Sequence, residues 1–106
     1  MSIFYNITGS SGVTVELIKP GSETNAIKSI LLTNTHDTTA ATVSLFIQND
    51  PSSESTNSYK LINLVSIPAS TSLILDDSSM FSFDKSEYGL YITVGGSDVL
   101  DVLINN

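Results

Sequence analysis

The chain of 106 residues contains no cysteine, no tryptophan and no arginine. Without cysteine it forms no disulfide, and with a single histidine it lacks the set of Cys and His ligands that zinc prefers. A chain of this length buries roughly two-thirds of the surface that its unfolded form exposes, so a hydrophobic core can stabilise one domain. We expect a single domain over residues 1–106 without a cofactor, in which residues 1–12 form an N-terminal strand or arm.

Positive charge is also scarce. Eleven acidic residues outnumber four lysines, giving a formal net charge of −7, and the lysines are scattered along the chain. Binding to a nucleic-acid backbone or to an anionic membrane needs clustered basic residues. The start of the chain lacks the basic and apolar regions of a signal peptide, and no stretch approaches the ~20 apolar residues of a membrane span. The sequence therefore predicts neither a nucleic-acid nor a membrane partner.

Helical periodicity is missing as well, and the pattern typical of strands takes its place. The clearest example is residues 26–49, where two runs of β-branched and aliphatic residues flank a polar break at residues 35–39. In the second run Val43, Leu45 and Ile47 share one face, which is the period of two expected of a half-buried strand. We interpret the whole stretch as a β-hairpin.

The remainder of the chain consists of short strand-like runs separated by turn residues. Pro20-Gly21 is typical of a type II turn, residues 49–58 read as an exposed loop, and Gly95-Gly96-Ser97-Asp98 predicts a second hairpin. Eight or nine runs at intervals of about ten residues predict an all-β fold, a single antiparallel β-sandwich of about eight strands. Jelly-roll and immunoglobulin-like wiring both fit this pattern.

Catalytic motifs are absent from the sequence. His36 lies in the central polar break, and no G-x-S-x-G elbow provides a nucleophile for it. We therefore expect a protein that is not an enzyme.

Calcium is the one metal for which ligands gather in the sequence. Four acidic residues lie on both sides of residues 80–83, and carboxylates from adjacent loops are the ligands that Ca²⁺ takes. The spacing of an EF-hand is missing, and acidic residues at strand ends are ordinary turn residues, so we expect no metal site. The weak calcium candidates are Asp76, Asp77, Asp84 and Glu87.

Several strands carry apolar residues on both faces, which exceeds what the core of one sandwich requires. Leu31 and Phe46 are the examples in the central stretch, each opposite the series expected to face the core. Apolar outer faces usually mark a partner surface. We predict that Leu31 and Phe46 belong to an interface; the alternative is that sheet curvature or the N-terminal arm covers them.

The runs IKSILLTNT, ATVSLFIQ, YKLINLVSIPASTSLILDD and YGLYITVGGSDVLDVLIN resemble small structural proteins of tailed bacteriophages, especially cyanophage types. The resemblance covers residues 1–106 and lies in spacing and style. It implies a non-enzymatic virion subunit, a capsid decoration, neck or tail component, that acts through protein–protein contacts. It further implies other virion proteins as partners, a homo-oligomer, and a location in the virion after assembly in the host cytoplasm.

A second class of function fits a β-sandwich of this size. The chain would then be a carbohydrate- or receptor-binding module, assisted by calcium. Sugar-binding faces usually present exposed aromatic rings, and the four tyrosines of this chain read more simply as half-buried strand residues. Calcium-dependent binding to a glycan array is the observation that separates the two readings.

Overall fold

The computed structural model describes residues 2–8, 12, 14–21, 26–49, 57–96 and 99–105. Strands dominate these ranges, and the only helical element among them is one short 3₁₀ turn. The all-β expectation is therefore confirmed. The elements are β1 (Ser2–Thr8), β2 (Thr14–Ile18), β3 (Ser29–Asn34), β4 (Ala41–Asn49), β5 (Ser58–Ile67), β6 (Thr71–Leu75), η1 (Ser78–Phe81), β7 (Tyr88–Gly95) and β8 (Val99–Asn105).

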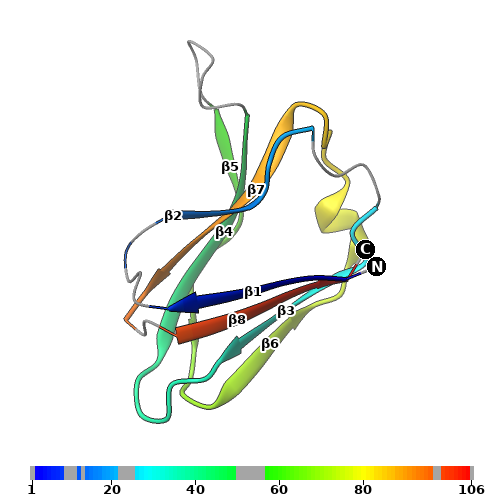
Figure 1. The fold of residues 1–106 in the computed structure, drawn as a ribbon. Coiled ribbons are helices and arrows are strands. Elements are labelled where there is room, and N and C mark those ends of the chain that lie inside the picture. Colours follow the sequence, from blue (N-terminus) through cyan, green and yellow to red (C-terminus); the bar gives the residue numbers. More distant parts are fainter. Residues whose placement is uncertain are drawn as a thin grey trace.

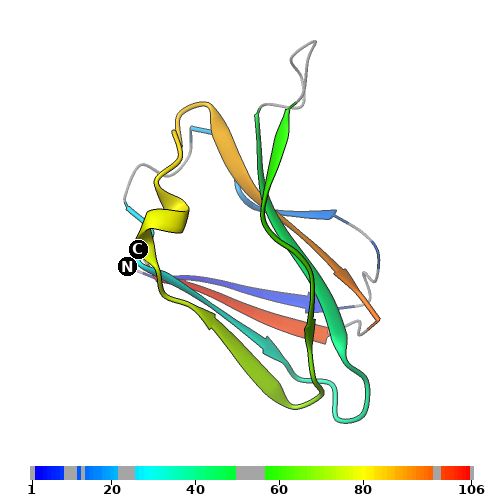
Figure 2. The same ribbon diagram turned by 180° about the vertical axis from the view of Figure 1, so that it is seen from behind.

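The strands form two four-stranded antiparallel sheets that pack face to face (Figures 1 and 2). One sheet has the order β1-β8-β3-β6, and the other has the order β2-β7-β4-β5. The pairs β1·β8, β2·β7, β3·β6 and β4·β5 are nested, as in a long hairpin that is folded at the β4–β5 connection and then wrapped around itself. This is the jelly-roll arrangement, one of the two wirings that the sequence left open.

Both predicted hairpins are wrong. β3 and β4 belong to different sheets, and so do β7 and β8, so each polar break carries the chain across the sandwich. Gly96 has a φ of 78°, as the Gly-Gly step suggested, but it packs where the two crossings meet, because an added Cβ would lie 2.7 Å from the Ala40 carbonyl oxygen. Among the strands of the described ranges, β4 and β5 are the only neighbours in sequence that pair. Residues 50–56 of the predicted loop between them lie outside the described residues.

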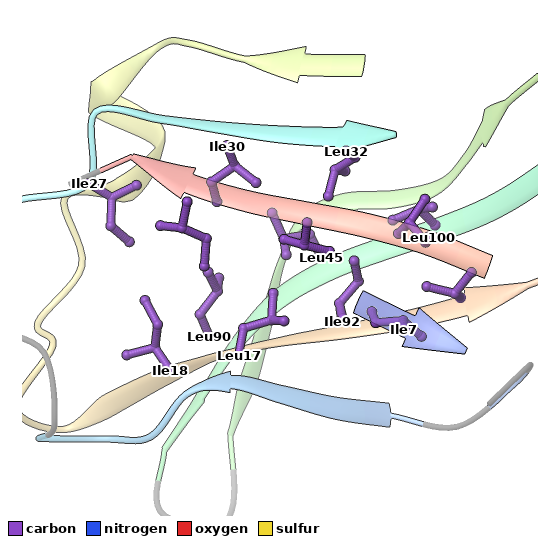
Figure 3. Packing of buried hydrophobic residues seen from close by; sticks show 14 of the residues in the cluster. Ile7, Leu17, Ile18, Ile27, Ile30, Leu32, Leu45, Leu90, Ile92 and Leu100 are labelled. Carbon is purple, nitrogen blue, oxygen red and sulfur yellow. The ribbon is translucent and has the colours of Figure 1, made fainter. Parts of the chain in front are cut away.

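Inward side chains of the two sheets form one core (Figure 3). The predicted inward series of β4, Val43, Leu45 and Ile47, belongs to this core. Leu32 of β3 and Ile92 of β7 point into it from opposite sheets. The period of two in the sequence thus identifies the buried face of each strand, even where it does not identify the pairing partner.

The N-terminal segment is part of a sheet. β1 pairs with β8 from Ser2 opposite Asn105 to Thr8 opposite Val99, so the two chain ends lie side by side (Figure 1). Tyr5 of this edge strand donates its hydroxyl hydrogen bond to the carbonyl of Leu17 in the other sheet. Burial, and secondarily the charge of Glu16, raises the pKa of Tyr5 above its ordinary value. β1 is therefore fastened on both sides.

One polar side chain, Asn34 at the end of β3, is fully buried at a chain crossing. Its Nδ2 donates to the carbonyls of Thr39 (2.8 Å) and Ile67 (3.1 Å), and its Oδ1 accepts from the backbone N–H of His36 (3.1 Å). Because buried polar groups are costly when left unpaired, these bonds fix the β3–β4 crossing against the end of β5.

Truncation of Leu45 should destabilise the fold strongly. The Leu45→Ala substitution leaves a cavity between the sheets and is expected to lower the free energy of unfolding by about 2–5 kcal/mol. Leu64 on β5 is the matched control, because it is 68% exposed and Leu64→Ala should change stability by no more than ~0.5 kcal/mol. Urea denaturation of the three proteins measures both effects. Equal midpoints for Leu45→Ala and wild type would contradict the core assignment.

Replacing Asn34 by Leu should also destabilise, although the new side chain is apolar and of similar size. The substitution leaves the Ile67 carbonyl and the His36 N–H without their hydrogen-bond partner. Each buried group left unsatisfied lowers the free energy of unfolding by about 1–3 kcal/mol. Thr33→Val is the control, because this neighbouring hydroxyl makes only an exposed bond to Ser72. The melting temperature of Asn34→Leu should lie well below that of Thr33→Val. The reverse order of melting temperatures would show that the Asn34 hydrogen bonds contribute little to stability.

Candidate functional site

At the centre of the outer face of the β2-β7-β4-β5 sheet, two aromatic rings are shielded by neighbouring side chains of the protein itself. One residue from each strand, in the order Glu16, Tyr91, Phe46, Lys60, forms a row across it, which we call the covered row. Tyr91 donates to the Glu16 carboxylate at 3.0 Å, and its ring stacks on Phe46 with centroids 5.9 Å apart. The Lys60 ammonium nitrogen lies 4.2 Å above the centroid of the Phe46 ring.

This cover corrects one predicted interface residue. Phe46 does lie opposite the inward series of β4, but only 6% of it is exposed. The prediction that Phe46 offers an accessible apolar surface is therefore wrong. Its ring is a neighbour of Tyr91 on one side and Lys60 on the other, and cross-strand neighbours of this kind are invisible without the register.

The outer face of the β1-β8-β3-β6 sheet has the opposite character, and we call it the open face. Leu31 lies in a row that again takes one residue from each strand in order, here termed the apolar row: Phe4, Leu103, Leu31 and Ile74. Phe4 is 70% exposed and Ile74 is 57% exposed, while Leu103 and Leu31 between them are half-buried. Leu31 thus has the outward direction that the sequence predicted.

A polar row runs beside the apolar row, two residues away from it on each strand. It consists of Asn6, Asp101, Thr33 and Ser72. Asn6 Nδ2 donates to Asp101 Oδ1 at 2.5 Å, and the hydroxyls of Thr33 and Ser72 are 2.9 Å apart. Asp101 is the only charged residue in the four strands of this sheet.

The two rows border a hollow on the open face. Its volume is about 470 Å³, and much of its lining is apolar. The side chains that line it include Phe4, Asn6, Leu31, Thr33, Asp101 and Leu103. Among these, Leu31 is the residue that the sequence predicted as part of an interface. The others were missed because strands 1, 3 and 8 meet through pairings that span most of the chain.

The four calcium candidates do not assemble into a metal site. Among the residues that the structure describes, no three of the types His, Cys, Asp and Glu are grouped so as to hold a metal. Asp77 instead accepts hydrogen bonds from the N–H and hydroxyl of Ser79, and Asp84 accepts the same pair from Ser86. Asp76 and Glu87 are exposed beside these turns. Two of the carboxylates therefore serve as turn caps.

His36 has a local role too. Its Nδ1 accepts hydrogen bonds from the backbone N–H groups of Thr38 and Thr39, both at 3.1 Å, and its carbonyl accepts from the N–H of Ser70 at 3.0 Å. The imidazole and the backbone thereby hold the β3–β4 crossing in shape. This use of Nδ1 as a local acceptor accounts for the histidine at this position.

The hydrogen bonds of the turn caps affect how the Asp77 carboxyl titrates. The hydrogen bond from the Ser79 side chain, together with that from its N–H, lowers the pKa of Asp77 below the ordinary 3.8. A carboxyl whose pKa is lower in the folded state adds stability above the unfolded pKa, and this contribution is lost as pH falls through the folded pKa. Ser79→Ala should therefore raise the pKa of Asp77 toward 3.8. In the same titration Asp84 should keep its lowered pKa, because its own bonds come from Ser86.

The measurement is a titration followed by NMR of the side-chain carboxyl carbons. A pKa of Asp77 that does not respond to Ser79→Ala would show that the serine hydroxyl is not its main partner. A parallel shift of Asp84 would indicate a global change rather than the loss of one cap.

No family model, curated protein or solved structure matches this chain. No helix among the described residues is long and apolar enough to cross a membrane. The two outer faces differ in their central rows: the Phe46 ring of the covered row is buried, whereas Phe4 and Ile74 of the apolar row are exposed.

Proposed function

We propose that this protein is a non-enzymatic structural subunit of a tailed-bacteriophage virion that docks on other virion proteins through the open face. The observation that carries the docking role is the apolar row Phe4, Leu103, Leu31 and Ile74, which crosses the whole sheet without a cover from the described chain. The virion setting comes from the family resemblance of residues 1–106. A capsid decoration, a neck protein and a tail component all fit this role.

The energetics favour a buried state for this face. Burying a large apolar side chain that is otherwise exposed contributes about 1.5–3 kcal/mol. Phe4 and Ile74 are each more than half exposed in the isolated chain, so a partner that covers both gains a substantial part of this energy. In a symmetric particle many such modest contacts act together, and the combined binding far exceeds that of one contact. The family resemblance also implies a closed homo-oligomer, whose contacts are separate from the docking contact of the open face.

The polar groups near the face support binding better than reaction chemistry. Asn6 and Asp101 are bonded to each other, and Thr33 is bonded to Ser72, so they form a passive polar border. A hydrolytic site would need a nucleophile with an adjacent base that activates it. The hydroxyl of Thr33 bonds to the Ser72 hydroxyl, and the Asp101 carboxylate opposite Thr33 accepts its hydrogen bond from Asn6.

Carbohydrate or receptor binding is the second candidate, and one observation favours it. The ring of Phe4 is exposed beside the Asn6–Asp101 pair, and an aromatic surface next to amide and carboxylate groups is suited to a sugar ring. A glycan array incubated with and without EDTA tests this candidate. A reproducible hit that is lost in Phe4→Ala would favour it over the structural role.

Removing the apolar row should abolish docking without unfolding the protein. The double substitution Phe4→Ser and Ile74→Ser changes two exposed side chains, so its melting temperature should stay within a few degrees of wild type. Tagged protein made in infected host cells should be incorporated into purified particles when wild type and be excluded when it carries the double substitution. Leu64→Ser is the matched control, an equally exposed apolar side chain on the other sheet, and should be incorporated normally.

Phe46→Ser separates the two faces further. Because the ring is buried within the covered row, this substitution should lower the melting temperature clearly, in contrast to the double substitution on the open face. Normal incorporation of the double variant would overturn the docking face. Failure to find the wild-type chain in purified particles by mass spectrometry would overturn the virion role itself.

A further inference from the structure

The four described strands that form the open face carry one negative charge and no positive one. Asp101 is the only charged residue in β1, β8, β3 and β6. Of the four lysines, Lys60 lies in the opposite sheet and the others lie outside the strands. A surface that joins apolar side chains to an isolated carboxylate is complementary to a partner that is both apolar and basic.

On the covered face the acid and the aromatic ring each have a partner in the same chain. Glu16 accepts a hydrogen bond from Tyr91, and the Lys60 ammonium nitrogen lies over the Phe46 ring at 4.2 Å. The open face also has an acid, Asp101, and an aromatic ring, Phe4, but its strands supply no lysine. Lys85 over Phe83, at 4.6 Å, is a second case of the same contact within this chain.

We infer that the hollow on the open face receives a lysine or arginine side chain from the docking partner. This inference rests on the proposed docking function. Leu31 and Leu103 offer apolar walls for the methylene stem of such a side chain, which packs well along apolar surface. The Asp101 carboxylate accepts charge-assisted hydrogen bonds from its head group, and the exposed ring of Phe4 attracts the cation.

Asn6 acts as a positioning residue for this contact. Its Nδ2 donates to one oxygen of Asp101 at 2.5 Å and so holds the carboxylate at the border of the hollow. An ionised carboxylate accepts about four hydrogen bonds over its two oxygens, so the bond to Asn6 leaves capacity for an ammonium or guanidinium group. The pair therefore presents a fixed acceptor beside the apolar row.

A second copy of this chain is a poorer occupant of the hollow. Packed face to face, two copies would bring two open faces together, each with Asp101 and neither with a strand lysine. Each copy also carries a net charge of −7, which opposes close approach. A neutral sugar would leave the charge of Asp101 without a counter-ion. A basic side chain from a different protein satisfies both the charge and the apolar walls.

Three blocked peptides test the inference on the full chain: Leu-Ser-Arg-Ser-Leu, Leu-Ser-Gln-Ser-Leu and Leu-Ser-Glu-Ser-Leu. In an extended peptide the two leucines and the central residue share one face. Backbone amide shifts in ¹⁵N NMR spectra give the site and the affinity. The arginine peptide should bind at least about tenfold more tightly than the glutamine peptide, with shifts at Asn6, Thr33, Asp101 and Leu103, and the glutamate peptide should bind most weakly.

The Asp101→Asn substitution should remove the preference for the arginine peptide. In the wild-type protein, raised salt should weaken this preference. Glu16→Gln is the matched control, because it removes the same charge from the opposite outer face, and should leave the preference unchanged. Asn6→Ala should reduce the preference, with Asp101 still present. The fold of each variant is checked by its unchanged amide spectrum away from the substitution.

The remaining outcomes overturn the inference in distinguishable ways. If the three peptides bind equally and Phe4→Ser abolishes their binding, the open face is a docking surface. The inference that it receives a basic side chain is then wrong. Binding of no peptide would also overturn the inference, while particle incorporation separately decides the docking function. A doubling of the light-scattering mass that Phe4→Ser abolishes would make a second copy the occupant, and shifts of the same amides by methyl glycosides would make it a sugar.

Discussion

Burial of the inward side chains of both sheets in one shared core is the constraint on which the rest of this structure depends. Since successive side chains of a strand point to opposite faces, placing Leu45 or Leu32 in the core turns Phe46 or Leu31 outward. The choice of core residues therefore decides which residues lie on the outer faces. These outward residues are either covered by other side chains of the protein or left exposed. It covers Phe46 with Tyr91 and Lys60, and no described segment covers the apolar row.

The difference between the two outer faces comes from the placement of very few charges. Lys60 lies beside Phe46 because the bulged β4–β5 pairing brings it there, and it supplies both an alkyl cover and a cation. The open face has only Asp101, whose partner Asn6 is neutral. A chain with four lysines and eleven acids has few cations to distribute, and no lysine lies in the strands of the open face.

The sequence predicted what depends on local pattern and missed what depends on pairing. The alternation of apolar and polar residues identified the inward face of β4 and the outward direction of Leu31. It depends only on residues that are neighbours in the sequence. Two crossings were mistaken for hairpins, because a polar break looks the same whether the chain turns within a sheet or passes to the other one. The apolar row needs Phe4 beside Leu103, and the cover of Phe46 needs Tyr91; both depend on registers between residues far apart in the sequence.

The jelly-roll wiring also ties the candidate site to complete folding. The apolar row takes its members from the first, last, third and sixth strands, and β8 lies between β1 and β3. Before β8 pairs with both β1 and β3, Phe4 and Leu31 do not belong to one sheet. The hollow, which is lined by residues of these three strands, does not exist before then. A partner that binds this face therefore binds only the folded chain. Such a partner would stabilise the whole fold by about 2.7 kcal/mol at a concentration one hundred times its dissociation constant, so the proposed docking and folding would reinforce each other.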